Sequence, residues 1–375
     1  MIDQTPAERH FARTVGIDYS GAETAESSLR GLRVYRSDDD LAPEEAAPPP
    51  GARKYWTRRG LADWLIALVS DGIPTIIGID HGFSFPMRYF ERHRLEPDWS
   101  CFLEDFCAHW PTDAPNTYVD FIRHGAMGAG RDRQGERRWR RLTEEAAGSA
   151  KSVFHFDVQE SVAKSTHAGI PWLRHIRAAR PELHFWPFDG WSPAPRTSVI
   201  AEVYPRLWSA AYPLEGRSAD QHDAYSVARW LQEADRDGTL QSALRPPEPQ
   251  PIATTAMVEG WILGVEWSEA PKLSARRTKV KSTPHRTVSL GISVEDLSLL
   301  EYDLPDHSGE DGLHYGYNVY FLEGSDAEGL ARVSGLGEQD WLRIGPLGAN
   351  DGEAEQDRLT RPRPYLFIIA RKRHT

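Results

Sequence analysis

The chain has 375 residues, of which 40% are hydrophobic and 26% charged, and its formal net charge is −11. This length predicts one large domain with an appendage or a second, smaller domain. The negative charge excludes a protein that coats nucleic acid through bulk electrostatics, although it leaves room for a local basic groove. The sequence opens without a basic region followed by an apolar core, and no run approaches the roughly 18 apolar residues that span a bilayer. A cytoplasmic protein without a membrane partner is expected.

The first predicted elements form a strand, helix and strand unit. The run RTVGIDYSGA, residues 13–22, indicates a buried strand that ends at Asp18, and a second extended run follows at about 32–37. A helix is predicted at about 58–71, and IPTIIGIDHGFSFP then indicates a strand that ends at Asp80. VGID and IGID are near copies on either side of this helix, which favours parallel neighbouring strands with both acids at one sheet edge.

One further strand and one strong helix complete this domain. Residues 87–195 are less regular and are interpreted as an insertion that covers one edge of the sheet. TSVIAEVYP predicts a strand at about 197–204, in which Glu202 interrupts an apolar run. In RSADQHDAYSVARWLQEADRDG, Ser218 and Gln221 have the spacing of a capping box, and Asp220 and Asp223 share one face of the first helical turn.

Composition divides the chain into three parts. Residues 1–268 are expected to form the main domain and residues 269–285 a basic linker. Residues 286–375 are expected to form a strand-rich C-terminal module of unknown role.

The acids that end or interrupt these elements form the candidate site. Burying an ionised carboxylate costs several kcal/mol unless the group is paired, hydrogen-bonded or bound to a metal. Carboxylates gathered at one sheet edge suit Mg²⁺ or Mn²⁺, and two such ions about 3.5–4 Å apart can activate water and stabilise the leaving oxygen in phosphodiester cleavage. A strand-end turn or a helix N-terminal charge is the simpler interpretation of any one acid, whereas the ordered set favours a metal site. The predicted catalytic residues are Asp18, Asp80, Glu202 and Asp223, and the predicted metal ligands are Asp18, Asp80, Asp220 and Asp223.

The motifs VGIDYSGA, IGIDHGFSFP, AEVYP and DQHDAYSVARW, followed by EGWILG, resemble the ribonuclease H-like proteins grouped as domain of unknown function 429. The resemblance covers about residues 13–265. The D-x-x-D-A of Asp220, Asp223 and Ala224 is also similar to the final helix of Holliday-junction resolvases. The resemblance implies an α/β fold with a mixed central sheet flanked by helices. It also implies a carboxylate centre of Asp18, Asp80 and Asp223, supported by Glu202 or Asp220, but no particular substrate.

Two other segments are candidates for substrate contact. Lys164, Thr166 and His167 in AKSTHAG are predicted to contact phosphate or transfer protons, although the glycines of a Walker A loop do not precede them and a solvated helix or loop is the alternative. RDRQGERRWRR, residues 131–141, contains six arginines and could follow a nucleic-acid backbone with a base stacked on Trp139. A solvent-exposed charged segment is the alternative.

These observations lead to two main functional hypotheses. The first is a metal-dependent phosphodiesterase or nuclease that acts on a nucleic acid or nucleotide through a carboxylate-bound Mg²⁺ or Mn²⁺. The second is a non-catalytic binding or regulatory protein with a ribonuclease H-like fold, because fold alone does not determine function. A nucleotide-binding phosphotransferase is a third hypothesis, but the sequence offers no convincing glycine-rich phosphate turn for it.

Overall fold

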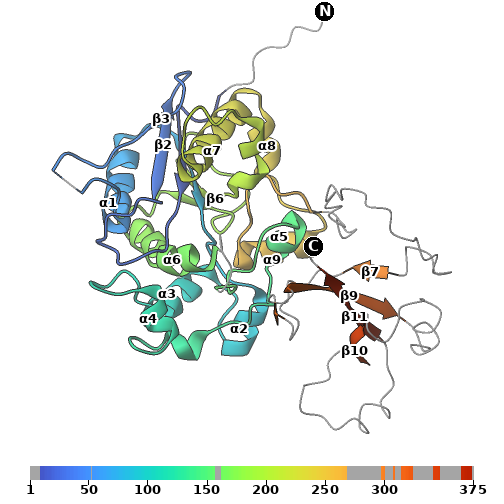
Figure 1. Cartoon of the computed structure of the whole chain (residues 1–375). Coiled ribbons are helices and arrows are strands. Elements are labelled where there is room, and N and C mark those ends of the chain that lie inside the picture. Colours follow the sequence, from blue (N-terminus) through green and yellow to red (C-terminus); the bar gives the residue numbers. More distant parts are fainter. Residues whose placement is uncertain are drawn as a thin grey trace, which may run out of the picture. The chain divides into compact units, whose positions relative to one another are not determined.

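The computed structural model divides the chain into two units, Met1–Arg276 and Arg277–Thr375 (Figure 1). It describes residues 9–51, 53–156 and 162–267 of the first unit and the backbone of five strands in the second. The linker predicted at 269–285 lies outside the described residues. No helix in the described ranges has the length and apolar character needed to cross a bilayer.

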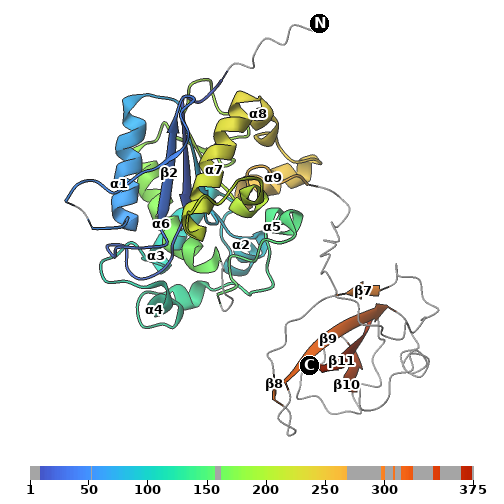
Figure 2. The same ribbon diagram turned by 45° about the horizontal axis from the view of Figure 1, so that its top comes forward.

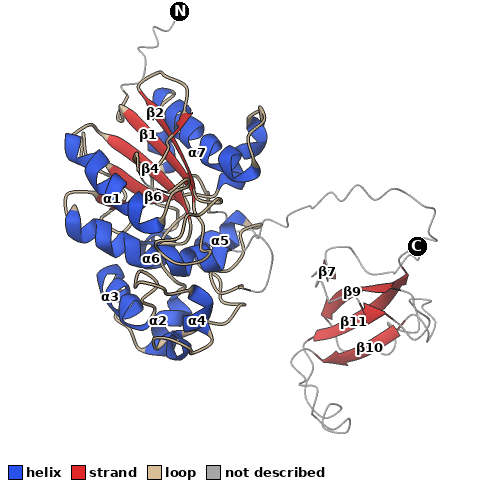
Figure 3. Ribbon diagram, turned by 60° about the vertical axis from the view of Figure 1, so that its left-hand side comes forward, coloured by secondary structure: helices blue, strands red, loops and turns tan. Residues whose placement is uncertain are grey.

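A six-stranded mixed sheet forms the centre of the first unit (Figure 3). Its order is β3-β2-β1-β4-β6-β5. Strands β1, β4, β6 and β5 are parallel to one another, β2 pairs antiparallel with β1, and β3 pairs antiparallel with β2. The strands are β1 (Arg13–Asp18), β2 (Arg33–Asp38), β3 (Glu44–Glu45), β4 (Thr75–Asp80), β5 (His184–Trp186) and β6 (Val199–Glu202). The mixed α/β class and the parallel pairing of the two GID strands are therefore confirmed.

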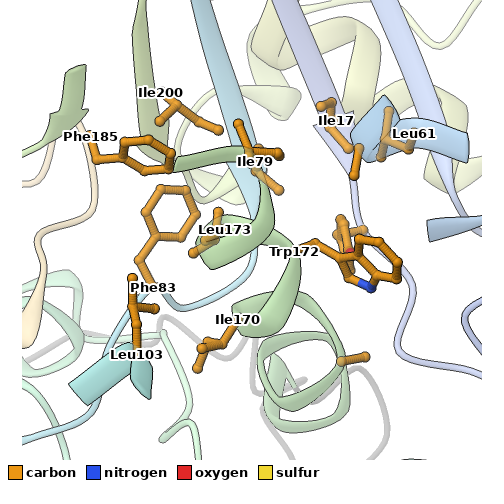
Figure 4. Close-up of a cluster of buried hydrophobic side chains, with 14 of the residues drawn as sticks. Ile17, Leu61, Ile79, Phe83, Leu103, Ile170, Trp172, Leu173, Phe185 and Ile200 are labelled. Atoms are coloured by element: carbon orange, nitrogen blue, oxygen red, sulfur yellow. The ribbon is translucent and has the colours of Figure 1, made fainter. Parts of the chain in front are cut away.

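Helices cover both faces of the sheet. On one face, α1 (Arg58–Leu68) and α6 (Val162–Ala179) pack their apolar side chains against β1 and β4, and Figure 4 shows Leu61 and Leu173 near Ile17 and Ile79. On the other face, α7 (Ala219–Arg236) lies over the sheet, and its residues Val227 and Leu231 pack with the side chains of β6. Successive strand residues point to opposite faces, so each strand contributes to both cores.

Local capping explains where two of these helices begin. The Thr57 hydroxyl accepts a hydrogen bond from Gly60 N at 2.9 Å at the start of α1. At the start of α7, the Ser218 hydroxyl accepts from Gln221 N at 3.3 Å and the Gln221 side chain accepts from Ser218 N at 3.0 Å. The predicted capping box is therefore present, and it fixes the end of α7 that carries the acids.

Residues 87–195 were predicted to be an insertion that covers one edge of the sheet, and the structure arranges them differently. They contain α2 (Met87–His93), α3 (Trp99–His109), α4 (Val119–Arg123) and α5 (Leu142–Ala147), in addition to α6 and β5. α6 packs beside α1 on a face of the sheet, and β5 is itself the edge strand. The aromatic residues of this segment, which obscure periodicity in the sequence, build a second layer of core around Phe85, Phe106 and Phe154.

The remaining elements end the first unit and form the second. α8 (Thr239–Ala243) and α9 (Gln250–Glu259) follow α7. The second unit contains β7 (Leu297–Leu299), β8 (His307–Ser308), β9 (His314–Glu323), β10 (Trp341–Pro346) and β11 (Tyr365–Arg373), as Figure 2 shows. The pairings described among them are all antiparallel, in the order β10-β11-β9-β7 with β8 also on β9.

Two glycines allow α7 to lie directly on the sheet. A Cβ atom at Gly16 would stand 2.2 Å from the Ala224 carbonyl oxygen, and one at Gly78 would stand 2.7 Å from Cγ1 of Val227. Residues two apart on a strand face the same side, so Asp18 and Asp80 also face α7. In each GID motif the glycine therefore leaves room for α7, and the aspartate side chain faces the first turn of that helix.

Substituting Gly16 with alanine is expected to lower the free energy of unfolding by about 3 kcal/mol, because the added methyl group meets backbone atoms of α7 that cannot rotate away. Gly31→Ala is the matched control, since the nearest atom to its Cβ would be 3.7 Å away, and we expect a change within about 0.5 kcal/mol. Urea unfolding monitored by tryptophan fluorescence measures both. Equal stability of the two variants would contradict the close packing of α7.

Candidate functional site

Asp18 and Asp80 lie side by side at the carboxyl ends of β1 and β4. The parallel pairing of these strands places Asp18 directly opposite Asp80. Neighbouring strands are about 4.8 Å apart, so the two carboxyl groups share one small region of the sheet edge. The predicted meeting of these two acids is therefore present in the fold.

The first turns of α7 add Asp220 and Asp223 to this region. Ala224, Val227 and Leu231 continue the same helical stripe and are buried against the sheet, which directs the two acids toward the strand ends. The pKa of Asp18 is raised well above its usual value, first by desolvation and then by the charges of Asp80, Asp220 and Asp223. Desolvation also raises the pKa of Asp80, with further contributions from Asp223 and Glu202. The acids are thus close enough to repel one another.

These acids line a cavity of about 510 Å³. This volume falls in the range of small-molecule sites, which is about 300–1,000 Å³. Other pocket-lining residues are Tyr19, Ser149, Lys151, Ser165, Tyr204, Arg206 and Ser209, which supply hydroxyl groups and two cationic side chains. The cavity therefore combines an acidic wall with groups that can hydrogen-bond to an anion.

The charges of Asp18 and Asp80 are not neutralised by an ion pair within the described ranges. Arg33 lowers the pKa of Asp18, but its charge is the weakest of the influences on that carboxyl group. Two carboxylates this close, in a desolvated setting, favour either protonation or a bound cation.

The acids do not form a closed metal cage. Among the residues that the structure describes, no group of three or more His, Cys, Asp or Glu side chains is arranged to hold a metal ion. Asp18, Asp80, Asp220 and Asp223 share one pocket, but their side chains would have to turn toward a common ion to bind it. The fold assembles the donors without fixing their final geometry.

Glu202 takes a different position from the other predicted acids. It pairs in register with Ile79, one residue short of Asp80, and therefore starts on the opposite face of the sheet. Its Oε1 accepts a hydrogen bond from Arg141 Nη2 at 2.6 Å, and its Oε2 accepts from Arg141 Nη1 at 2.7 Å and from Phe83 N at 3.1 Å. Glu202 lines the cavity, but both of its oxygens already have donors. The structure thus shows Glu202 in an ion pair with Arg141, and its catalytic role stays a prediction.

Arg141 is a site residue that the sequence analysis did not single out. Its side chain is 1% exposed and also bonds Glu144, whose Oε1 accepts from Arg141 Nε at 2.9 Å. Burial alone would lower the pKa of Arg141, but the charges of Glu202 and Glu144 outweigh it and raise the pKa. The sequence of the six-arginine segment does not indicate that Arg141, its last residue, is buried.

Glu259, the first residue of the EGWILG motif, holds the segment that carries Arg141. Its carboxylate accepts hydrogen bonds from Met87 N at 2.6 Å and from Leu142 N at 2.7 Å. The end of α9 is thereby joined to the starts of α2 and α5. Burial raises the pKa of Glu259 to about 7, against the lowering effect of these two bonds.

The predicted substrate-binding residues of α6 do not line the cavity. Lys164 pairs with Asp120 at 2.7 Å, and the fully buried Thr166 hydroxyl accepts from Gly82 N at 2.9 Å. His167 is fully buried among aromatic rings, and burial lowers its pKa to about 3. The cavity instead meets Val162 and Ser165, which are three residues apart on the helix. Helical periodicity thus turns Thr166 and His167 into the core, which corrects the prediction for these two residues.

Comparisons of the chain with protein-family models, with curated proteins and with solved structures gave no match. The resemblance described from the motifs therefore stays a prediction. The functional argument rests on the pocket and on the side chains that line it.

Proposed function

We propose that this protein is a metal-dependent phosphodiesterase with a ribonuclease H-like domain, acting on a nucleic acid or nucleotide. The observation that carries the proposal is the pair Asp18 and Asp80, set side by side in a cavity and facing Asp220 and Asp223 on α7. Such an arrangement is costly unless a positive charge offsets it.

The donor set fits Mg²⁺ or Mn²⁺. These ions prefer carboxylate oxygens, and the carboxylates of Asp18 and Asp80 stand on adjacent strands about 4.8 Å apart, close enough that both could serve as ligands. Asp18 and Asp80 would hold the ion from the sheet, and Asp220 and Asp223 would complete the site from α7. A bound divalent ion supplies an activated water and offsets the charge that develops on the phosphate.

The chain's own side chains have separate tasks in this proposal. The Lys151 and Arg206 cations lie on the cavity lining and would attract and orient the phosphate. Arg141 withdraws Glu202 from the acidic wall, because it bonds both oxygens of that carboxylate. The number of negative charges that face the substrate is thereby reduced.

Substituting Asp18 with asparagine is expected to abolish Mn²⁺-dependent hydrolysis of bis(p-nitrophenyl) phosphate, lowering its rate about 100-fold or more, because a metal-binding oxygen is lost while the shape is kept. Asp237→Asn, at the far end of α7, is the matched control and should leave the rate unchanged. The release of p-nitrophenolate measures both rates. Undiminished hydrolysis by the Asp18 variant would contradict the proposal.

A non-catalytic binding protein is the second candidate. One observation favours it: the described residues include no ready-made group of three metal ligands. Calorimetric titration with Mn²⁺ separates the two candidates. If millimolar Mn²⁺ does not bind to the wild type and Asp18→Asn gives the same result, the non-catalytic binding protein is favoured.

A further inference from the structure

Two exposed arginines stand at the corner of a turn in the arginine-rich segment. Trp139 N donates a hydrogen bond to the Glu136 carbonyl at 2.9 Å, which closes a turn with Arg137 and Arg138 at its central positions. Both side chains are exposed, and neither forms an ion pair within the part of the chain that the structure describes. The turn therefore presents two adjacent positive charges to solvent.

The turn is anchored on both sides. A Cβ atom at Gly135 would lie 2.3 Å from the Phe154 ring, so the backbone before the turn packs directly on that ring. After the turn, the Trp139 ring packs edge-on against Phe154 with centroids 6.2 Å apart, and the Ser152 hydroxyl donates to the Trp139 carbonyl at 2.5 Å. Trp139 is thus partly buried against the core beside the turn, and base stacking on its ring stays a prediction.

The anchored turn lies close to the cavity. Arg140 donates to the Ala150 carbonyl at 2.8 Å, which holds the turn beside Ala150 and Lys151, and both of these residues line the cavity. Arg141 also lines it, and Arg138 is three residues away, or at most about 11 Å along the chain. The two exposed cations are therefore within a few nucleotides of the acidic wall.

Three other arginines of the segment bond to groups within the protein. Arg133 bonds Asp105 at 3.0 Å, and Arg141 is buried with Glu202. Arg140 donates to the carbonyl oxygens of Glu144 and Ala150. Arg131 is exposed like Arg137 and Arg138, but it stands alone, whereas Arg137 and Arg138 place two adjacent charges at the corner of one turn.

We propose that Arg137 and Arg138 bind the phosphates of a single-stranded nucleic acid that extends from the cavity. The cavity has the volume of a small-molecule site, so it can take part of a flexible strand and is too small to enclose a stacked duplex. Guanidinium groups bind phosphate in a bidentate manner, and phosphate contacts position a strand without reading its sequence. The inference rests on the proposed function and adds to it a substrate class, a strand longer than the pocket.

Binding of fluorescein-labelled dT12 and rU12, measured by fluorescence anisotropy in EDTA over a series of KCl concentrations, tests this. Arg137→Ala/Arg138→Ala is expected to raise the Kd of at least one probe about tenfold at low salt and to reduce the slope of log Kd against log[KCl] by about 1.4, because two phosphate contacts are lost. Arg236→Ala/Arg245→Ala removes the same charge from two other exposed positions and should leave Kd within about twofold. Arg236 is the last residue of α7, about 20 Å along the helix from Asp223, and Arg245 follows α8.

The inference is overturned if the two double variants weaken binding equally, if the slope does not change, or if neither probe binds the wild-type protein. The probe that shows the expected loss indicates the sugar of the strand, since the two differ in the 2′-hydroxyl and, apart from it, only in the 5-methyl group of thymine. Binding is measured without metal, so its result can be interpreted even if the protein shows no metal-dependent hydrolysis. Equal thermal unfolding temperatures of the variants show that the exposed turn has not been disrupted.

Discussion

Asp80→Asn is expected to stabilise the metal-free protein and to abolish the proposed metal-dependent hydrolysis. Asp80 is partly buried beside Asp18 and Asp223, and desolvation followed by their charges and that of Glu202 raises its pKa well above the usual value. Asparagine has the same shape without the charge. We expect the free energy of unfolding in EDTA at pH 8 to rise by about 1–2 kcal/mol, because the substitution removes a desolvated charge that neighbouring carboxylates repel.

The pH dependence of this gain has a defined sign. A carboxyl group whose pKa is raised by folding binds its proton more tightly in the native state, so its contribution to stability is present below about pH 4 and is lost as the pH rises toward its native pKa. The advantage of Asp80→Asn over the wild type should therefore grow from pH 4 to pH 8. Urea unfolding at both pH values measures it, and Asp237→Asn should show no such gain. A variant less stable than the wild type at pH 8 would mean that Asp80 has a favourable native partner.

Added Mn²⁺ should reverse the order of stability. A ligand that binds only the native state stabilises it by about 2.7 kcal/mol at a concentration 100 times its Kd. The wild type should gain this stability and Asp80→Asn should not. On this proposal the Asp80 carboxylate would destabilise the metal-free protein and stabilise the metal-bound protein, a trade-off that is common at functional sites.

Arg141→Met is expected to lower the free energy of unfolding by about 3–5 kcal/mol, the usual loss when one partner of a buried ion pair is removed. The substitution would leave the carboxylates of Glu202 and Glu144 desolvated and without their cation. Urea unfolding at pH 7 measures the loss. A lysine would be a poor replacement, because it cannot reproduce the paired bonds of the guanidinium group to Glu202.

The control for this prediction neutralises the two carboxylates that lose their cation. Adding Glu202→Gln and Glu144→Gln to Arg141→Met should recover part of the lost stability, because neutral amides are less costly to bury than unpaired carboxylates. No recovery would show that Arg141 acts mainly through its packing. A loss below about 1 kcal/mol in the single variant would contradict the importance of the ion pair.

The sequence by itself determined the architecture around the first two acids. Two near-identical GID strands separated by one amphipathic helix led to parallel neighbours, and the register does place Asp18 opposite Asp80. The capping residues Ser218 and Gln221 located the start of α7, and the spacing of Asp220 and Asp223 placed both acids on one of its faces. These features depend on periodicity and on hydrogen bonds between residues close in the chain, which a sequence displays directly.

Only the tertiary structure decided which polar side chains enter the cavity and which support it. Glu202 differs from Asp80 by one residue of register, and this single step turns it to the other face of the sheet, where Arg141 bonds it. Thr166 and His167 point into the core because α6 packs on the sheet, a contact that its local sequence does not specify. Register and the partners of buried charges are set by residues far apart in the chain, such as Arg141 and Glu202, which are 61 positions apart. They therefore appear only when the chain is folded.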